Sequence, residues 1–152
     1  MSFAITDWLI SGDISPLRRG DSSEKLKKLF TGSYKNIALL KKQGCPYIVL
    51  DLVEFYFTDD KNFAGLEEII IKPVSLYNGI KTTFIDADWL KDDLTFDFVS
   101  KKLTELAVIW QVERGPYFDT PNIRTSTEVL FAFDPDRVSD NEAELIKIYL
   151  KK

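Results

Sequence analysis

Hydrophobic and polar positions alternate with a period of two over much of the chain, and a few shorter stretches follow a helical period instead. In the first half, stretches of this kind separated by short turns predict four strands, at 36–42, 46–52, 53–59 and 66–74. In the third strand, VEFYFTD, the alternation places Val53, Phe55 and Phe57 on one face. Glu54 and Tyr56 fall on the other face, so we expect one face to be core and the other to be partly exposed.

Two segments before these strands follow the helical period. Residues 3–11 carry a broad apolar stripe, and Gly12 directly after them suits the left-handed position that ends a helix. A second helix is predicted to begin where Asp21 or Ser22 can cap it, since Asp21 and Glu24 have the spacing of a capping box. The first half therefore reads as helices followed by an antiparallel meander, the arrangement expected for strands joined by short turns.

The same pattern restarts in the second half of the chain. Thr95 can cap a helix, TFDFVSKKLTEL, over 95–106. Alternating stretches then predict four more strands, at 107–114, 122–127, 129–135 and 143–151.

A nearly constant shift relates the two halves. The phrase V-x-F-x-F-x-x-D begins at Val53 and again at Val129, a shift of 76 (129 − 53). The helix starts match at a shift of 73, and the last strands match at 77, where Ile69 meets Ile146 (146 − 69). One order of elements at one shift predicts a tandem duplication, with repeats at about 12–78 and 86–152.

These expectations combine into one fold. The chain is predicted to be an α+β protein, a single domain over 1–152, in which two tandem helix–antiparallel-meander repeats share one continuous antiparallel sheet with the helices on one face. A lone repeat of about 65 residues would bury little surface and be marginal. Joining two repeats edge to edge removes two exposed strand edges and enlarges the core. The sheet face away from the helices is the expected binding surface.

Composition narrows the function. A hydrophobic content of 45% is enough for a packed interior, and a net charge of −4 argues against a general nucleic-acid partner. The absence of histidine excludes histidine-based acid–base and triad chemistry, and the single cysteine, Cys45, excludes an internal disulfide. The start of the chain is unlike a signal peptide, and there is no apolar run of about 18 residues. We therefore expect a cytoplasmic protein with no membrane partner, no metal and no cofactor.

Two carboxylate pairs are candidates for acid–base work, Asp59 with Asp60 and Asp134 with Asp136. Both pairs come directly after the V-x-F-x-F strand, where acidic residues commonly form turns. The turn interpretation is favoured, and no catalytic residue is assigned.

Aromatic and arginine side chains are the stronger candidates for binding, because Tyr, Trp and Arg anchor protein interfaces. The stretch ERGPYFDTPNIR, 113–124, is predicted to be the longest loop of the second half. Together with the outward-facing tyrosine of the third strand it supplies the predicted binding residues: Tyr56, Arg114, Tyr117, Phe118 and Arg124.

The phrase PLRRGDSSEKLKKLF, followed by a strand pair, VEFYF and LEEIIIKP, resembles a known unit. That unit is the helix-plus-meander of the β-lactamase-inhibitor-protein-like and outer-membrane assembly lipoprotein (SmpA/BamE-like) folds. More narrowly, the chain resembles uncharacterised bacterial proteins of this tandem type, some of which are immunity proteins of toxin systems. Together with the absence of catalytic constellations, the resemblance implies a non-enzymatic module, immunity- or inhibitor-like, that binds another protein, with a toxin as one candidate. We expect a monomer or weak homodimer.

Two other functions stay open. One is a small-molecule-binding or carboxylate-dependent hydrolytic module, which predicts a deep pocket lined by at least two ionisable groups with shifted pKa values. The other is a different immunity-type α+β fold, the SMI1/KNR4-like class, which differs in topology.

Overall fold

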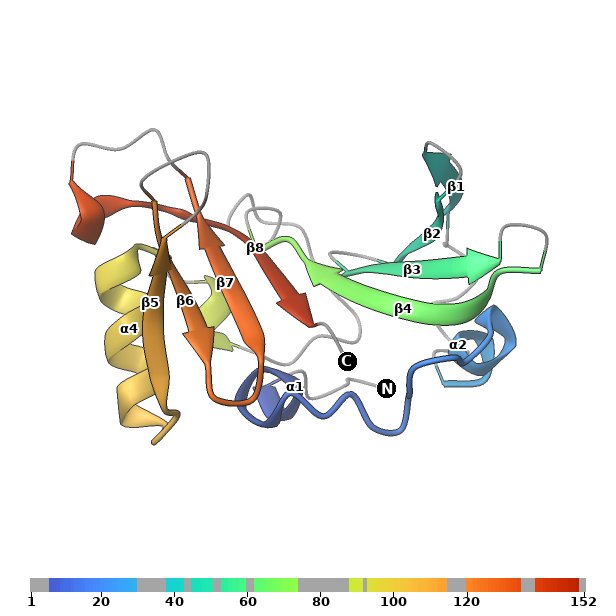
Figure 1. Cartoon of the computed structure of the whole chain (residues 1–152), viewed down its shortest axis with the longest axis horizontal. Helices are drawn as coiled ribbons and strands as arrows, with labels where there is room; N and C mark the ends of the chain where they lie inside the picture. Colours follow the sequence, from blue (N-terminus) through green and yellow to red (C-terminus); the bar gives the residue numbers. More distant parts are fainter. Residues whose placement is uncertain are drawn as a thin grey trace.

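The computed structural model describes residues 6–29, 38–42, 45–50, 53–59, 62–73, 88–91, 93–114, 120–134 and 139–150. Over these ranges the protein is α+β and is built on one eight-stranded antiparallel sheet (Figure 1). The strand order is β1-β2-β3-β4-β8-β7-β6-β5, so two meanders meet where β4 pairs with β8. The predicted fold class and the single continuous sheet are confirmed.

The elements follow the predicted order along the chain. The α-helices are α1 (Thr6–Ser11), α2 (Ser23–Leu29) and α4 (Phe96–Glu105), and the short 3-10 helices are η2 (Asp88–Lys91) and η3 (Asp140–Glu142). The strands of the first half are β1 (Ala38–Lys42), β2 (Cys45–Leu50), β3 (Val53–Asp59) and β4 (Ala64–Ile71). Those of the second half are β5 (Trp110–Arg114), β6 (Pro121–Thr125), β7 (Val129–Phe133) and β8 (Leu145–Leu150). Each described helix is too short or too polar to cross a bilayer.

The core lies on the sheet face that the helices cover. Alternate positions of β3 and β7 are buried there, as the pattern predicts: Val53, Phe55, Phe57, Val129, Phe131 and Phe133. Helix side chains join the same cluster: Trp8, Leu9, Leu26, Val99 and Leu103. Fully burying one such aromatic side chain contributes about 1.5–3 kcal/mol. These side chains form one contiguous cluster, to which three helices and alternate positions of the strands contribute. The helices therefore lie on one face of the sheet, as predicted.

The sheet curves away from this core. In Figure 1, β1 and β2 rise from β3 at one end and β5, β6 and β7 stand upright at the other, so the strand direction changes strongly along the sheet, while α1 and α2 lie below. Native sheets twist and coil in this way because of the handedness of their strands. We call the sheet face opposite the helices the open face.

The helix ends obey the predicted local rules. Gly12 has a φ of +69°, and its N–H donates to the Trp8 carbonyl at 2.9 Å, which ends α1. At the start of α4, Thr95 Oγ1 accepts a hydrogen bond from the Phe98 N–H at 3.2 Å. At α2 the helix begins at Ser23, so the capping position is Ser22 and the predicted capping box of Asp21 with Glu24 is wrong; the Asp21 carboxylate accepts a hydrogen bond from the Arg18 N–H instead.

The two helix starts relate to the sheet in the same way. The Leu66 N–H donates to the Asp21 carbonyl at 2.8 Å, and the Leu145 N–H donates to the Leu94 carbonyl at 2.8 Å. In each half, the residues before the helix thus pair with the beginning of the last strand. Asp21 and Leu94 are 73 positions apart (94 − 21), the predicted shift. The common ancestry of the halves stays a prediction.

The predicted alignment of the last strands is wrong by two residues. Phe55 stands opposite Ile69 in β4, and its counterpart Phe131 stands opposite Ile148 in β8, an offset of 79 (148 − 69) rather than 77. The connection before β8 is therefore longer than the strand pattern alone indicates. A register irregularity follows Tyr56 in β3 and Ala132 in β7, which are again 76 apart.

The predicted loop 113–124 is also wrong in extent. β5 runs to Arg114 and β6 begins at Pro121, so half of this stretch is strand. Glu113 stands opposite Asn122 in the ladder, and its carboxylate pairs with Arg124, which holds the two strand ends together. The strand predicted to begin at 107 begins instead at Trp110.

The N-terminal helix is tied to the second half. Thr127 Oγ1, in the turn between β6 and β7, donates to the Ile10 carbonyl at 3.0 Å. The Trp8 indole donates to the Ser15 carbonyl at 3.0 Å, which fixes the segment that follows α1. The Thr127–Ile10 hydrogen bond, between residues 117 positions apart, joins α1 to the second half.

Candidate functional site

One row of side chains crosses the open face through seven strands. The ladder register places it from β2 to β5 as Val49, Glu54, Ile70, Tyr149, Leu130, Arg124 and Gln111. Side chains directly opposite one another in an antiparallel pair have Cβ atoms about 4.5–5.5 Å apart, so neighbours in the row interact. The row carries two charged centres, at Glu54 and at Arg124.

Glu54 is a buried carboxylate on this face, with 6% of its side chain exposed. It pairs with Lys72, and it accepts a hydrogen bond from the Tyr56 hydroxyl at 2.5 Å. Burial by itself would raise the pKa of Glu54, but the hydrogen bonds from Lys72 and Tyr56 and the charges of Lys72 and Lys147 together lower it. The carboxylate is therefore held charged and engaged.

Tyr56 and Tyr47 form a stacked pair beside this carboxylate. Their ring centroids lie 5.0 Å apart with an interplanar angle of 15°, and both rings are half-buried. Burial, the hydrogen bond to Glu54 and the negative charge of Glu54 raise the pKa of Tyr56 well above its ordinary value. The hydroxyl stays protonated, so it acts as a fixed donor. We call Tyr47, Glu54, Tyr56 and Lys72 the tyrosine–carboxylate cluster.

Tyr149 continues the open face across the seam between the halves. It stands opposite Ile70 in β4 and opposite Leu130 in β7. Burial and then the negative charge of Glu68 raise its pKa. Three half-buried tyrosines thus lie on this face, over β2, β3 and β8.

Arg124 marks the other end of the open face, on β6, four strands along the sheet from Tyr56. Its guanidinium makes a bidentate contact with Glu113 and reaches Glu128 at 3.5 Å. The hydrogen bond to Glu113 and the two negative charges raise the pKa of Arg124. The arginine is consequently held in place by its own neighbours.

The predicted binding residues do not form one surface. Tyr56 and Arg124 lie on the open face. Arg114 lies on the helix-covered face, because it follows Trp110 and Val112 at alternate positions of β5 and so shares their side of the sheet. Arg114 pairs there with Asp140 of η3 at 2.8 Å. The two remaining members of the set, Tyr117 and Phe118, lie outside the described residues.

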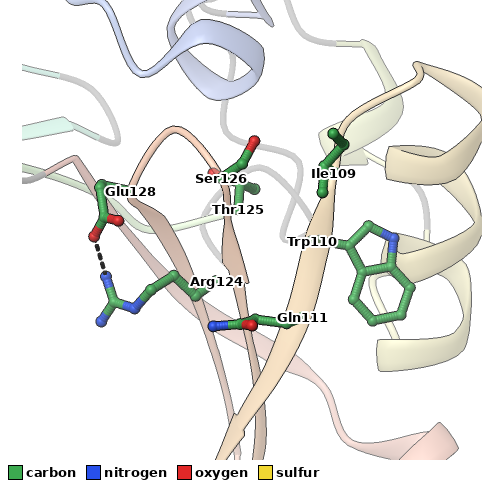
Figure 2. A pocket seen from close by; sticks show the side chains of 7 residues that line it. All are labelled: Ile109, Trp110, Gln111, Arg124, Thr125, Ser126 and Glu128. Carbon is green, nitrogen blue, oxygen red and sulfur yellow. Dashed lines mark hydrogen bonds and ion pairs between the residues drawn. The ribbon is translucent and has the colours of Figure 1, made fainter.

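A small hollow opens at the ends of β5 and β6, next to Arg124. Its volume is about 180 Å³, and Figure 2 shows the residues that line it: Ile109, Trp110, Gln111, Arg124, Thr125, Ser126 and Glu128. In the view, Gln111 and Arg124 lie side by side, and Trp110 points away toward α4. A hollow of this size is smaller than the roughly 300–1,000 Å³ typical of small-molecule sites.

The predicted carboxylate pairs are only partly described. Asp59 accepts hydrogen bonds from the backbone N–H and the side-chain amide of Asn62, at 3.4 and 3.3 Å, as a turn residue does. Asp60 and Asp136 lie outside the described residues. Within the described ranges, no three side chains of metal-ligating type come together.

Sequence reasoning missed Lys72, Tyr149 and Lys147. Lys72 could have been found, because extending the alternation of β4 beyond Ile70 places it on the face of Glu54. Tyr149 required the pairing of β4 with β8, which no local pattern specifies.

In comparisons with known proteins, no family model, no curated protein and no solved structure matches this chain. The function is therefore argued from the open face itself.

Proposed function

We propose that this protein is a non-enzymatic protein-binding module that holds a partner protein on the open face of its sheet. The observation that carries the proposal is the tyrosine–carboxylate cluster, a stacked tyrosine pair next to the ion pair of the buried Glu54, on the sheet face that none of the described helices covers. The cluster belongs to the first half, with its residues on β2, on β3 and directly after β4 (Figure 1).

The chemistry of the cluster fits protein recognition. Tyrosine gives a large, rigid contact area and a polar end, and few of its torsions must be ordered on binding. Stacking of Tyr47 on Tyr56 and the hydrogen bond to Glu54 order these rings before any partner arrives. Preorganisation of this kind lowers the entropic cost of association.

The charge state of Glu54 favours binding over acid–base catalysis. A catalytic carboxylic acid needs a pKa raised toward the working pH. The pKa of Glu54 is lowered instead, because Lys72 and Tyr56 donate hydrogen bonds to it. Such a carboxylate orients its neighbours and presents a fixed charge pattern to a partner, which contributes specificity.

The finer assignment follows the sequence resemblance. An immunity- or inhibitor-like role, with another protein such as a toxin as the partner and the cytoplasm as the setting, is the function we propose for this face. A partner that fits would present hydrogen-bond acceptors to Lys72 and apolar or aromatic surface to the tyrosines.

The test starts with capture of partners from a lysate of the native cells by immobilised protein. A purified partner is then titrated against Tyr56→Ala and Arg124→Ala, with Lys101→Ala on α4 as the control, since the Lys101 side chain is 71% exposed on the helical side. We expect Tyr56→Ala to weaken binding by about tenfold or more, as truncating an interface anchor does. Arg124→Ala tests whether the contact extends to β6, and the control should leave the affinity unchanged.

Two results would contradict the proposal. One is a partner whose affinity is the same for the wild type, Tyr56→Ala and Arg124→Ala. The other is sustained catalytic turnover of a substrate by the purified protein.

A further inference from the structure

The outer strand β5 is an edge of the sheet with exposed apolar side chains and few of the residues that usually protect an edge. It is the last strand in the order of the described sheet, and the exposed large hydrophobic residues of the described chain lie on it or next to it, Val112 at 45% and Ile109 at 74% exposure. Edge strands are commonly protected by lysine, proline or a bulge. The sequence of β5, WQVER, contains neither lysine nor proline, whereas the opposite edge strand β1, ALLKK, ends in two lysines.

The ladder shows which backbone groups point outward at this edge. The Ser126 N–H donates to the Ile109 carbonyl at 2.8 Å, which makes these two residues a hydrogen-bonded pair in the register of β5 and β6. Hydrogen-bonded and non-hydrogen-bonded pairs alternate along an antiparallel ladder. Gln111 and Glu113 therefore bond toward β6, and the N–H and carbonyl of Val112 point away from it.

We propose that two copies of this chain pair through β5, antiparallel and centred on Val112, into a symmetric dimer with one continuous sheet. At the two-fold axis, Val112 of each copy would exchange both backbone hydrogen bonds with the other. The two exposed valine side chains would then lie directly opposite each other and be buried together.

The flanking side chains of β5 are complementary to themselves in this register. Gln111 stands opposite Glu113 of the second copy on the open face, where an amide can donate to a carboxylate. Trp110 stands opposite Arg114 of the second copy on the helical face, where a guanidinium can lie against the indole. A slip that centres the pairing on Glu113 would instead place two glutamates face to face, which is unfavourable.

Trp110 is already fixed for such a contact. Its ring meets Phe96 edge to face at 6.3 Å and 86°, and its Nε1 donates to Thr104 Oγ1 at 3.0 Å. A surface hollow beside it is lined by Asp97, Ser100, Lys101, Thr104 and Glu105, and its two carboxylates pair with lysines of α4, Asp97 with Lys101 and Glu105 with Lys102. Space for the arriving guanidinium is therefore open beside the indole.

The expected dimer is weak. Five residues on each chain make the pair, whereas specific, stable interfaces bury about 1,600 Å² in total. We therefore expect a monomer–dimer equilibrium that responds to concentration in purified protein, independent of the partner proposed for the open face.

The first experiment measures the molar mass of the full chain by sedimentation velocity from about 1 to 500 µM. The wild type should shift toward the dimer over this range, and Val112→Lys, which sets two ammonium groups opposite each other, should stay monomeric. Ser126→Lys is the matched control, because it adds the same charge in the exposed turn next to β5 and should still dimerise. A wild type that is monomeric throughout, or a Val112→Lys protein that dimerises equally, would overturn the proposal.

A cross-link tests the register directly. In a Cys45→Ala background, Val112→Cys would bring two thiols opposite each other at a Cα separation of about 5.5 Å, within the range of a disulfide. Mild oxidation should link Val112→Cys into dimers in high yield. Gln111→Cys in the same background faces Glu113 and should link far less. Equal yields from the two cysteine positions would refute the Val112-centred pairing.

Discussion

The two partners of the Glu54–Lys72 ion pair differ in how far they are exposed to water, and this difference gives a testable prediction. Only 6% of the Glu54 side chain is exposed, against 44% for Lys72. Lys72→Met removes the ammonium and leaves a charged carboxylate buried, whereas Glu54→Leu leaves a lysine that can turn to water. We expect Lys72→Met to lower the free energy of unfolding more than Glu54→Leu does.

The magnitude follows from the exposure of Lys72. Breaking a fully buried ion pair by removing one partner costs about 3–5 kcal/mol. Because Lys72 is nearly half exposed, water screens the pair and can reach the site, so we expect about 2 kcal/mol for Lys72→Met. Glu54→Leu should cost less than about 1 kcal/mol, since it loses the hydrogen bond from Tyr56 but buries apolar surface.

The second half indicates what the double variant should do. Leu130 occupies the position of β7 that Glu54 occupies in β3, and it is accommodated there opposite Tyr149. Glu54→Leu with Lys72→Met should therefore return to within about 0.5 kcal/mol of the wild type, as replacing buried ion pairs by apolar residues often does. The two substitutions would then couple by about 2 kcal/mol, as residues in direct contact do.

The pH dependence has a definite sign. The folded-state pKa of Glu54 is lowered, so its contribution to stability is present above the unfolded-state pKa, near 4.5, and is lost as the pH falls through the folded-state value. In Lys72→Met, burial dominates and the pKa should lie higher than in the wild type. The difference in the free energy of unfolding between the wild type and Lys72→Met should thus be largest at pH 7 and shrink toward pH 3.

Urea unfolding followed by circular dichroism at both pH values measures these differences, provided the m-values agree. Lys147→Met is the matched control, because Lys147 acts on Glu54 through its charge alone in the described contacts and should cost less than about 0.5 kcal/mol. The reasoning fails if Lys72→Met matches Lys147→Met at pH 7, or if its loss persists undiminished at pH 3.

Three backbone features give further predictions. Thr95→Ala should lower the free energy of unfolding by about 1 kcal/mol by removing the cap on the Phe98 N–H, and Thr95→Ser should lose less than half as much; equal losses in urea titration would contradict the cap. Gly65→Ala should cost about 2 kcal/mol or more, because Gly65 has a φ of +77° and a Cβ there would collide with Thr58 Oγ1. Gly20→Ala, at φ +97° with open space around it, should cost only about 1 kcal/mol in the same thermal unfolding series, and an equal loss would show that the collision is relieved freely.

Local patterns predicted most of this fold because they depend on neighbouring residues. The alternation in VEFYFTD identified the buried face of β3, and Thr95 identified the start of α4. Both rest on the geometry of single elements, a period of two and a cap three residues from its donor. Such features survive in the folded chain whenever the element forms at all.

The register and pairing of the strands were harder to predict from the sequence, for a physical reason. Leu66 and Ile69 are buried on one face although they are three residues apart, because the irregularity after Tyr56 inserts a residue into the ladder. The same three-residue step separates Leu145 from Ile148, and recognising it would have corrected the alignment of the last strands. Alternation alone assumes a regular ladder and cannot count the inserted residue.

Which residues belong to the candidate site depends on whether the odd or the even positions of each strand face the core. Arg114 and Arg124 are both charged residues on neighbouring strands, yet they lie on opposite faces of the sheet, because the register of β5 on β6 sets which side each one occupies. Because 113–124 was predicted to be a loop, there was no prediction from the sequence of how β5 and β6 are aligned there. The seam of β4 and β8, which brings Tyr149 beside Ile70, joins residues 79 positions apart (149 − 70) and leaves no local trace.

The two halves provide an internal comparison that separates stability from function. On the helical face the V-x-F-x-F positions are the same residue types in both halves and are equally buried, whereas on the open face Glu54 and Tyr56 correspond to Leu130 and Ala132. Since the second half folds with Leu130 and Ala132, the sheet does not require an ion pair or a tyrosine stack at these positions. Glu54→Leu with Tyr56→Ala should therefore keep a cooperative fold while losing the partner of the open face; loss of folding together with binding would show instead that the cluster is structural.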